Sequence, residues 1–178
     1  MKGPIVIICA ALMLGLSAGA QQPEPAKPGQ AKPRVSKLSL MDTVKLYVQK
    51  AGASADETKS TADMVVSNLP DARSAKLTIV IVNDRRKSLL GFYIYNFGNL
   101  KDAPGRDEVS KYLLAANDLI TIGSFFVDNE QDIGYKYLIS TQQPLAQAVF
   151  DSIYFTMAAV ARERRAEIKR LLGQAPIR

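Results

Sequence analysis

Three acidic residues at alternate positions, Asp128, Glu130 and Asp132, are the pattern in this sequence that comes closest to a metal site. Side chains two residues apart converge when a loop coils around a calcium ion. Such a loop also needs a glycine at its sixth position, where this chain has Ile133, and a bidentate glutamate at its twelfth, which is missing. We therefore interpret the run DNEQD as a turn between two strands, and we expect neither a metal ion nor another cofactor.

No other pattern of residues predicts catalysis. Acid–base chemistry by two carboxylates needs acids that converge from different elements, and no motif selects a pair such as Asp118 and Asp151. The sequence contains no glycine-rich phosphate loop and no nucleophile elbow. After residue 20 it has no cysteine, histidine or tryptophan, so thiol nucleophiles, imidazole bases and the commonest zinc ligands are absent together. We predict that the protein is not an enzyme; an enzyme with an unrecognised carboxylate site is the alternative.

Tyrosines on two predicted strands are candidates for a binding face: Tyr93, Tyr95, Tyr135 and Tyr137. Tyrosine rings stack on ligands, but on strands they also pack against their cross-strand neighbours. The first interpretation would make the protein a small-ligand-binding periplasmic domain, and the second makes these residues part of the sheet.

The first 20 residues have the features of a secretory signal peptide. Lys2 precedes an apolar run from Ile5 to Leu16, and Ala18-Gly19-Ala20 is the small-x-small pattern at which signal peptidase cleaves. The apolar run is too short for a permanent membrane span. Processing as a lipoprotein at Cys9 is disfavoured because the bulky Ile8 precedes the cysteine. We predict a periplasmic or secreted protein.

Composition divides the rest of the chain into a linker and one domain. Residues 21–37 hold four of the nine prolines and almost no large apolar side chain, which predicts a disordered linker. Residues 38–172 are predicted to form the domain and residues 173–178 a tail. The net charge of +6 comes mainly from the first 37 residues, because residues 38–178 carry 18 basic and 16 acidic side chains. The domain is thus close to neutral, so we predict no binding to nucleic acid.

The first half of the domain reads as a helix followed by three strands. Ser39 can cap a helix that ends near Gly52, and residues 62–68 are a strand or a short helix before Pro70 stops it. The run 77–82 is apolar on both faces, which predicts a central strand covered on two sides. In the returning strand 89–97, one face carries Leu90, Phe92 and Ile94, and a half-exposed aromatic face carries Tyr93, Tyr95 and Phe97.

The second half reads as a helix, a hairpin and a long helix. Asp107 can cap the first helix, and alternation predicts strands over 122–127 and 133–139. The long helix is predicted from Pro144 to Leu172. It has two adjoining apolar stripes, one through Leu145, Val149, Ile153 and Met157 and one through Ala146, Phe150, Tyr154 and Ala158. If the first stripe packs on the sheet, Phe150 and Tyr154 still need cover. We predict that they form an interaction surface for a second copy of the chain or another protein; cover by the first helix within the monomer is the alternative.

The expected fold is therefore α+β, with one antiparallel sheet flanked by helices in the order α-βββ-α-ββ-α. This order resembles the YbjN-like family, whose fold is similar to that of type III secretion chaperones. The resemblance covers about residues 39–172 and is carried by LTIVIVNDRRKSLLGFYIYNFG and YLLAANDLITIGSFFVDNEQDIGYKYLIS, including Asn117 and the Ile-Gly-Ser-Phe run at 122–125. It implies a noncatalytic, often dimeric module that binds protein segments or acts as a chaperone.

Overall fold

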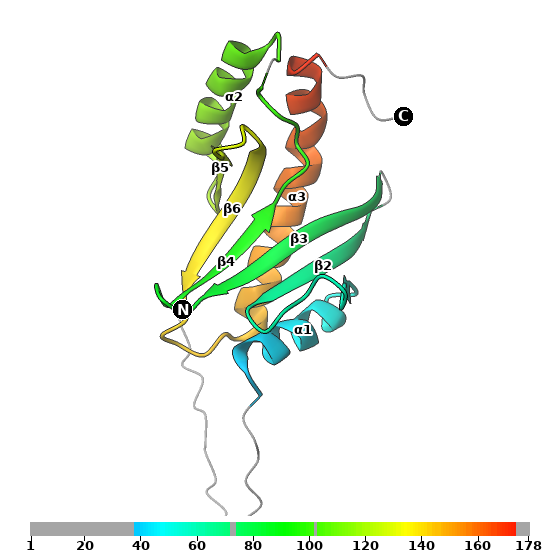
Figure 1. Ribbon diagram of the computed structural model, residues 1–178, viewed down its shortest axis with the longest axis vertical. Coiled ribbons are helices and arrows are strands. Elements are labelled where there is room, and N and C mark those ends of the chain that lie inside the picture. Colours follow the sequence, from blue (N-terminus) through cyan, green and yellow to red (C-terminus); the bar gives the residue numbers. More distant parts are fainter. Residues whose placement is uncertain (1–37, 72–73, 102, 174–178) are drawn as a thin grey trace, which may run out of the picture. The chain divides into compact units, whose positions relative to one another are not determined.

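A computed structural model describes residues 38–71, 74–101 and 103–173 of the chain. These residues form one six-stranded antiparallel sheet with three helices, the last of them long (Figure 1), which confirms the predicted α+β class and the predicted order of the main elements. The expected signal peptide, the linker and residues 174–178 lie outside the described residues.

Helix α1 spans Leu40–Lys50, and its start follows the predicted capping. The Ser39 side chain accepts a hydrogen bond from the backbone N–H of Asp42, which satisfies one of the amides that the first turn leaves without a partner. The helix ends before Gly52, whose φ of 76° suits a residue without Cβ. Val44 and Val48 bury one face of α1 against the core.

The sheet has the strand order β1-β2-β3-β4-β6-β5. The first four strands follow one another along the chain: β1 (Ser54–Ala55), β2 (Met64–Asp71), β3 (Ser74–Asp84) and β4 (Leu89–Ile94). Strand β6 (Ile133–Ser140) pairs with β4, and β5 (Ser124–Val127) forms an edge beside β6. The two-residue strand β1 was not predicted, because its sequence is short and polar.

Strand β2 decides between the strand and the short helix predicted for residues 62–68, and it shows that Pro70 does not end this element. The segment is a strand, and it continues past Pro70 to Asp71 with a register shift between Leu69 and Asp71. A proline is tolerated here because β1 pairs only with Ser67 and Asn68 and the register shift leaves residue 70 without a partner in β3, so neither neighbouring strand requires an N–H from it.

Strand β3 differs from the prediction of a strand covered on two sides. Leu77, Ile79 and Ile81 are fully buried, whereas Thr78 and Val80 on the opposite face are only partly buried. The apolar run therefore marks one core face and one half-exposed apolar face. In β4, Leu90, Phe92 and Ile94 are buried as predicted.

Phe97 is the exception to the predicted alternation of the returning strand. Strand β4 ends at Ile94, and Asn96 has a φ of 73°, which turns the chain so that Phe97 becomes fully buried instead of joining the half-exposed face. Its ring contacts Phe125 edge to face, with the centroids 5.2 Å apart.

Helix α2 spans Arg106–Leu119 and begins beside the last turn of the long helix, where Gly105 lies against the backbone of Leu171. The predicted cap at Asp107 is wrong: the cap position is Gly105, no side chain bonds there, and Asp107 lies in the first turn, where its charge complements the helix dipole. Val109, Leu113 and Ala116 bury one face of α2.

The long helix α3 spans Gln147–Leu171, three residues later than the predicted start at Pro144. Figure 1 shows α3 behind the sheet, and together with α1 it covers one face. Its buried side chains come from both predicted stripes, and Phe150 contacts Tyr47 of α1 and Phe92 of β4. The core thus lies between α1, α3 and one face of the sheet.

Candidate functional site

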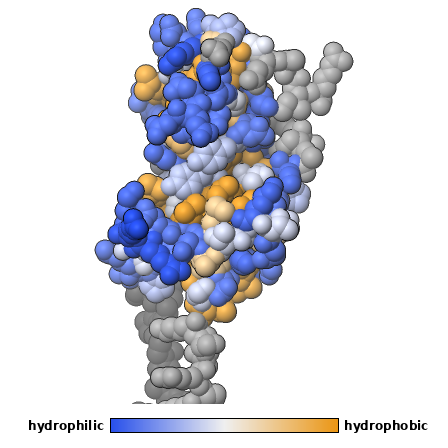
Figure 2. Space-filling model, viewed as in Figure 1, coloured by the Kyte–Doolittle hydropathy of each residue, from blue (hydrophilic) through white to orange (hydrophobic). Residues whose placement is uncertain are grey.

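The sheet face opposite α1 and α3, which we call the open face, carries several half-exposed apolar and aromatic side chains. Residues that pair directly across antiparallel strands share a face. One such row runs through Val80, Tyr93, Lys136 and Ser124, in strands β3, β4, β6 and β5. Figure 2 views the molecule from this side and shows hydrophobic residues gathered over the middle of the sheet, between two hydrophilic zones.

Three aromatic rings on the open face form what we call the aromatic cluster: Tyr93, Tyr95 and Phe126. The Tyr93 and Tyr95 rings are stacked, with centroids 6.3 Å apart and planes 13° from parallel. The Phe126 ring meets both edge to face, at centroid distances of 6.4 Å and 5.8 Å. These are favourable arrangements for aromatic pairs. Tyr95 is nevertheless 40% exposed, so the cluster keeps surface that a partner can cover.

Two glycines let these rings lie close to the sheet. A Cβ atom at Gly91 would be 2.5 Å from the Tyr93 ring, and one at Gly134 would be 2.4 Å from the Phe126 ring. Each ring therefore occupies the space that a side chain would fill. Gly134 pairs directly with Phe126, and Gly91 lies two residues before Tyr93 in the same strand. The glycines and rings together make a low aromatic surface in the middle of the face.

Charged groups border the aromatic cluster on both sides. The ammonium of Lys136 lies 4.9 Å from the centroid of the Phe126 ring, within the range of a cation–π interaction. Burial raises the pKa of Tyr95 above its usual value, and Asp128, Tyr93 and Asp132 raise it further. The turn at 128–132 therefore gives one end of the cluster an acidic neighbour, and Lys136 gives it a basic one.

The four predicted tyrosines do not share a face. Tyr93 and Tyr95 lie on the open face, whereas Tyr135 pairs with Ile94 and Tyr137 with Phe92, both of which point into the core. Tyr135 is fully buried and donates a hydrogen bond to the carbonyl of Ile122. The four tyrosines therefore do not form one ligand-binding face, because the register of β4 on β6 places the two pairs on opposite sides of the sheet.

Phe150 and Tyr154, the other predicted surface residues, belong to the core. Both are fully buried within one chain, and their rings stack on each other with centroids 5.2 Å apart. The Tyr154 hydroxyl shares a hydrogen bond with Ser67 of β2. The Tyr47 ring of α1 covers Phe150 at 5.6 Å. Helix α1 therefore covers Phe150 within the monomer, so no second subunit is needed at this position. Phe150 and Tyr154 form no interaction surface.

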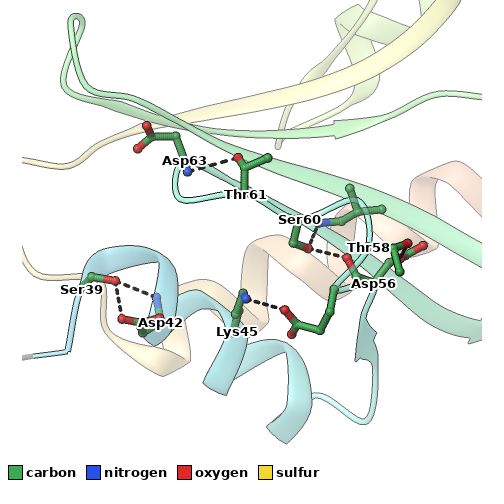
Figure 3. Close-up of polar contacts among 10 residues, drawn as sticks. Ser39, Asp42, Lys45, Asp56, Thr58, Ser60, Thr61 and Asp63 are labelled. Carbon is green, nitrogen blue, oxygen red and sulfur yellow. Dashed lines mark hydrogen bonds and ion pairs between the residues drawn. The ribbon is translucent and has the colours of Figure 1, made fainter.

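A polar hollow of about 590 Å³ lies between the start of α1 and the loop that precedes β2. Figure 3 shows the Ser39 and Asp42 side chains of this hollow joined by a hydrogen bond. Lys45, which also lines it, forms an ion pair with Glu57 at 2.7 Å. Arg85 contacts Asp63 at 2.6 Å. These contacts hold the loop against α1 and the β3–β4 turn, so we assign the hollow a structural role.

The acidic residues considered above for chemistry act locally. Asp128 accepts hydrogen bonds from the backbone N–H groups of Glu130 and Asp132, and Asp132 accepts one from Asn99. These bonds build the β5–β6 turn. Within the described ranges, no group of three or more histidine, cysteine or acidic side chains is placed to hold a metal ion. Asp118 is exposed at the end of α2, and Asp151 lies in the second turn of α3.

An apolar groove of about 280 Å³ continues the surface beyond β5. It lies between α2 and β5 and is lined by Leu113, Leu114, Phe125, Phe126 and Val127, so Phe126 belongs to both the groove and the aromatic cluster. Asn117 also lines the groove, and its carboxamide forms two hydrogen bonds with the backbone of Phe125.

Sequence reasoning missed Phe126 and Lys136 as members of the site. Alternation in the hairpin does place Lys136 on the face opposite Tyr135 and Tyr137. What was missing was the pairing of β4 with β6, because only that pairing brings Lys136 beside Tyr93.

The fold defines a single α+β domain whose sheet has one covered and one open face. Comparison with known proteins finds no family model and no curated protein that matches this chain. The resemblance to the YbjN-like family therefore stays an expectation. None of the helices in the described part of the chain has the length and apolar character needed to cross a lipid bilayer.

Proposed function

We propose that the protein is an exported, noncatalytic module that binds polypeptide segments on the open face of its sheet, as a protein-binding or chaperone-like domain. The observation that carries the proposal is the aromatic cluster, three mutually packed rings that remain accessible on a face without a covering helix among the described residues. Aromatic residues are enriched in the cores of protein interfaces, since they bury much area at little entropic cost.

The neighbours of the cluster extend it into a surface large enough for a peptide. Leu138 is 42% exposed, and Val80 and Val82 are half-buried on the same face. Contiguous exposed apolar side chains on a soluble domain mark sites of interaction. Export rests on residues 1–20 of the sequence, and the proposed place of action is the periplasm or the exterior of the cell.

Selection from a displayed random-peptide library on the immobilised full chain tests this function. The parent should enrich peptides that bind with micromolar affinity, and the double variant Tyr95→Ser/Phe126→Ser should bind them at least tenfold more weakly. Leu119→Ser is the control, because Leu119 is 76% exposed on α2. Tyr95→Ser alone serves if the double variant is poorly folded.

Two outcomes would overturn the proposal. One is the absence of enrichment on the parent. The other is unchanged peptide binding by the folded Tyr95 and Phe126 variants, which would move binding away from the open face.

A further inference from the structure

Basic residues and a small cavity beside the aromatic cluster specify what kind of segment fits the open face. The cavity has a volume of about 100 Å³ and lies at the end of β4. It is lined by Lys76, Thr78, Val80, Tyr95, Asn96 and Arg165. Its walls are thus one exposed tyrosine, one valine, two cationic side chains and two neutral polar side chains.

The size and the lining of this cavity suit a carboxylate. A water molecule takes roughly 30 Å³ of liquid volume, so the cavity has room for a group of about three heavy atoms. Lysine and arginine are the strong hydrogen-bond donors for carboxylates. The Thr78 hydroxyl donates to Asn68 at 3.1 Å, which holds that side chain in place at the cavity wall.

Lys136 supplies a second basic position on the other side of the cluster. Its ammonium lies over the Phe126 ring, and its strand pairs it with Tyr93. Neither Lys76 nor Lys136 has a carboxylate within salt-bridge distance in the part of the chain that the structure describes. The rings therefore lie between basic groups that can accept an acidic partner.

The acidic residues near Tyr95 limit where such a partner's charges can lie. Asp128 and Asp132 are close enough to raise the pKa of Tyr95, and both are held by hydrogen bonds in the β5–β6 turn. A partner carboxylate is repelled at this end of the cluster. It is attracted toward Lys76 at the cavity and toward Lys136.

We infer that the open face binds an extended acidic and apolar peptide segment, whose carboxylates meet Lys76 and Lys136 while its apolar side chains cover the aromatic cluster. This inference rests on the proposed function and names the class of its partner. A segment fits better than a second copy of the chain. Six strands at about 4.8 Å spacing and about six residues of 3.4 Å cover roughly 600 Å², below the roughly 800 Å² that each partner buries in a standard interface.

The test measures fluorescence anisotropy with two labelled ten-residue peptides on the full chain. One alternates glutamate with leucine, and the other alternates glutamine with leucine. At 50 mM salt the glutamate peptide should bind the parent about tenfold more tightly, since two or three exposed ion pairs contribute about twofold to fivefold each. This preference should shrink several-fold at 300 mM salt, because added ions screen exposed charges.

Protein variants locate the preference on the surface. Lys76→Gln/Lys136→Gln should abolish it, and the control Lys59→Gln/Lys111→Gln, with the same loss of charge outside the open face, should retain it. Tyr95→Ser should weaken the binding of both peptides to the same extent.

Each contrary result has a distinct meaning. Equal binding of both peptides overturns the acidic specificity and leaves the proposed function standing. If the peptide library enriches only peptides without acidic residues, the acidic specificity is likewise overturned and the proposed function stands. If the library enriches no peptide, the proposed function itself is overturned. Light scattering in the same buffer is the last arm: a dimer that Tyr95→Ser dissociates would show that a second copy occupies the face, which overturns the inference.

Discussion

The side chain of Asn117 forms with Phe125 the two hydrogen bonds that a neighbouring strand would form. Its carboxamide oxygen accepts from the Phe125 N–H at 2.7 Å, and its amide nitrogen donates to the Phe125 carbonyl at 3.1 Å. Phe125 lies in the middle of β5, the edge strand of the sheet. Unpaired edges invite pairing with other chains. A helix residue thus occupies part of an edge that would otherwise stay open.

Replacement of Asn117 by leucine should therefore destabilise the domain and favour association. The variant loses both bonds at a partly buried position, and we expect the free energy of unfolding to fall by about 1–2 kcal/mol. Asp118→Leu is the matched control, because it brings the same gain in helix propensity at the next, exposed position. Urea titration gives the stability and light scattering the mass. Equal stability of the two variants would show that the carboxamide contributes nothing at this edge.

The fully buried position of Phe150 makes a second prediction about α3. Phe150→Asp should lower the free energy of unfolding by 4 kcal/mol or more, because it removes a core ring and buries a charge. Val149→Asp is the control, since Val149 is 48% exposed in the first turn of the same helix. It should cost less than about 1 kcal/mol.

Circular dichroism during urea unfolding measures both variants. A Phe150→Asp protein that stays folded and only loses a dimer would place this ring at a subunit interface and contradict its position in the core.

Local signals predicted much of the fold, because they depend on residues close together in sequence. The Ser39 cap and the alternation of β4 up to Ile94 are of this kind. Two errors were also local. The positive φ of Asn96 redirects Phe97 into the core, and Gly105 takes the cap position expected at Asp107. Neither event changes the hydrophobic period that the prediction used.

The candidate site could be predicted only in part, because it depends on which strands pair and in what register. Alternation placed Tyr93 and Tyr95 on a half-exposed face, but only the pairing of β4 with β6 excludes Tyr135 and Tyr137 from that face and adds Lys136 to it. The same holds for α3. Its two stripes are equally apolar in sequence, and the packing of Tyr47 on Phe150 decides that the second stripe is interior.

The contact of Gly134 with Phe126 predicts a variant that changes the surface with little effect on stability. In Gly134→Ala the new methyl group must displace the Phe126 ring, which can rotate toward solvent. The free energy needed to displace the ring is offset by the lower conformational entropy of the unfolded variant. We therefore expect the free energy of unfolding to change by no more than about 1 kcal/mol. Peptide binding to the open face should fall severalfold. The ring resonances of Phe126 and Tyr95 in NMR spectra report the movement, and Ser124→Ala on the same face is the control. Unchanged resonances would mean that the glycine leaves more room than its contact with the ring indicates.

The buried hydroxyl of Tyr135 predicts how stability changes at alkaline pH. Burial raises the pKa of Tyr135 to about 12, whereas a tyrosine in the unfolded chain has a pKa of about 10. Between these values the unfolded chain binds fewer protons than the folded one, so the free energy of unfolding falls as pH rises. The stabilisation that comes from the raised pKa of Tyr135 is fully present below about pH 9 and is lost as the pH rises to about 12. It amounts to about 2–3 kcal/mol at most.

Tyr135→Phe separates this contribution from the other groups that titrate at high pH. At pH 8 the variant should be about 1 kcal/mol less stable than the parent, because it lacks the hydrogen bond to the Ile122 carbonyl. As pH rises toward 12 the parent should lose stability faster, since phenylalanine has no proton to release, and the variant should become the more stable protein. Urea titrations at pH 8, 10 and 11.5 measure the difference. A constant difference across this range would show that Tyr135 titrates alike in the folded and unfolded chains.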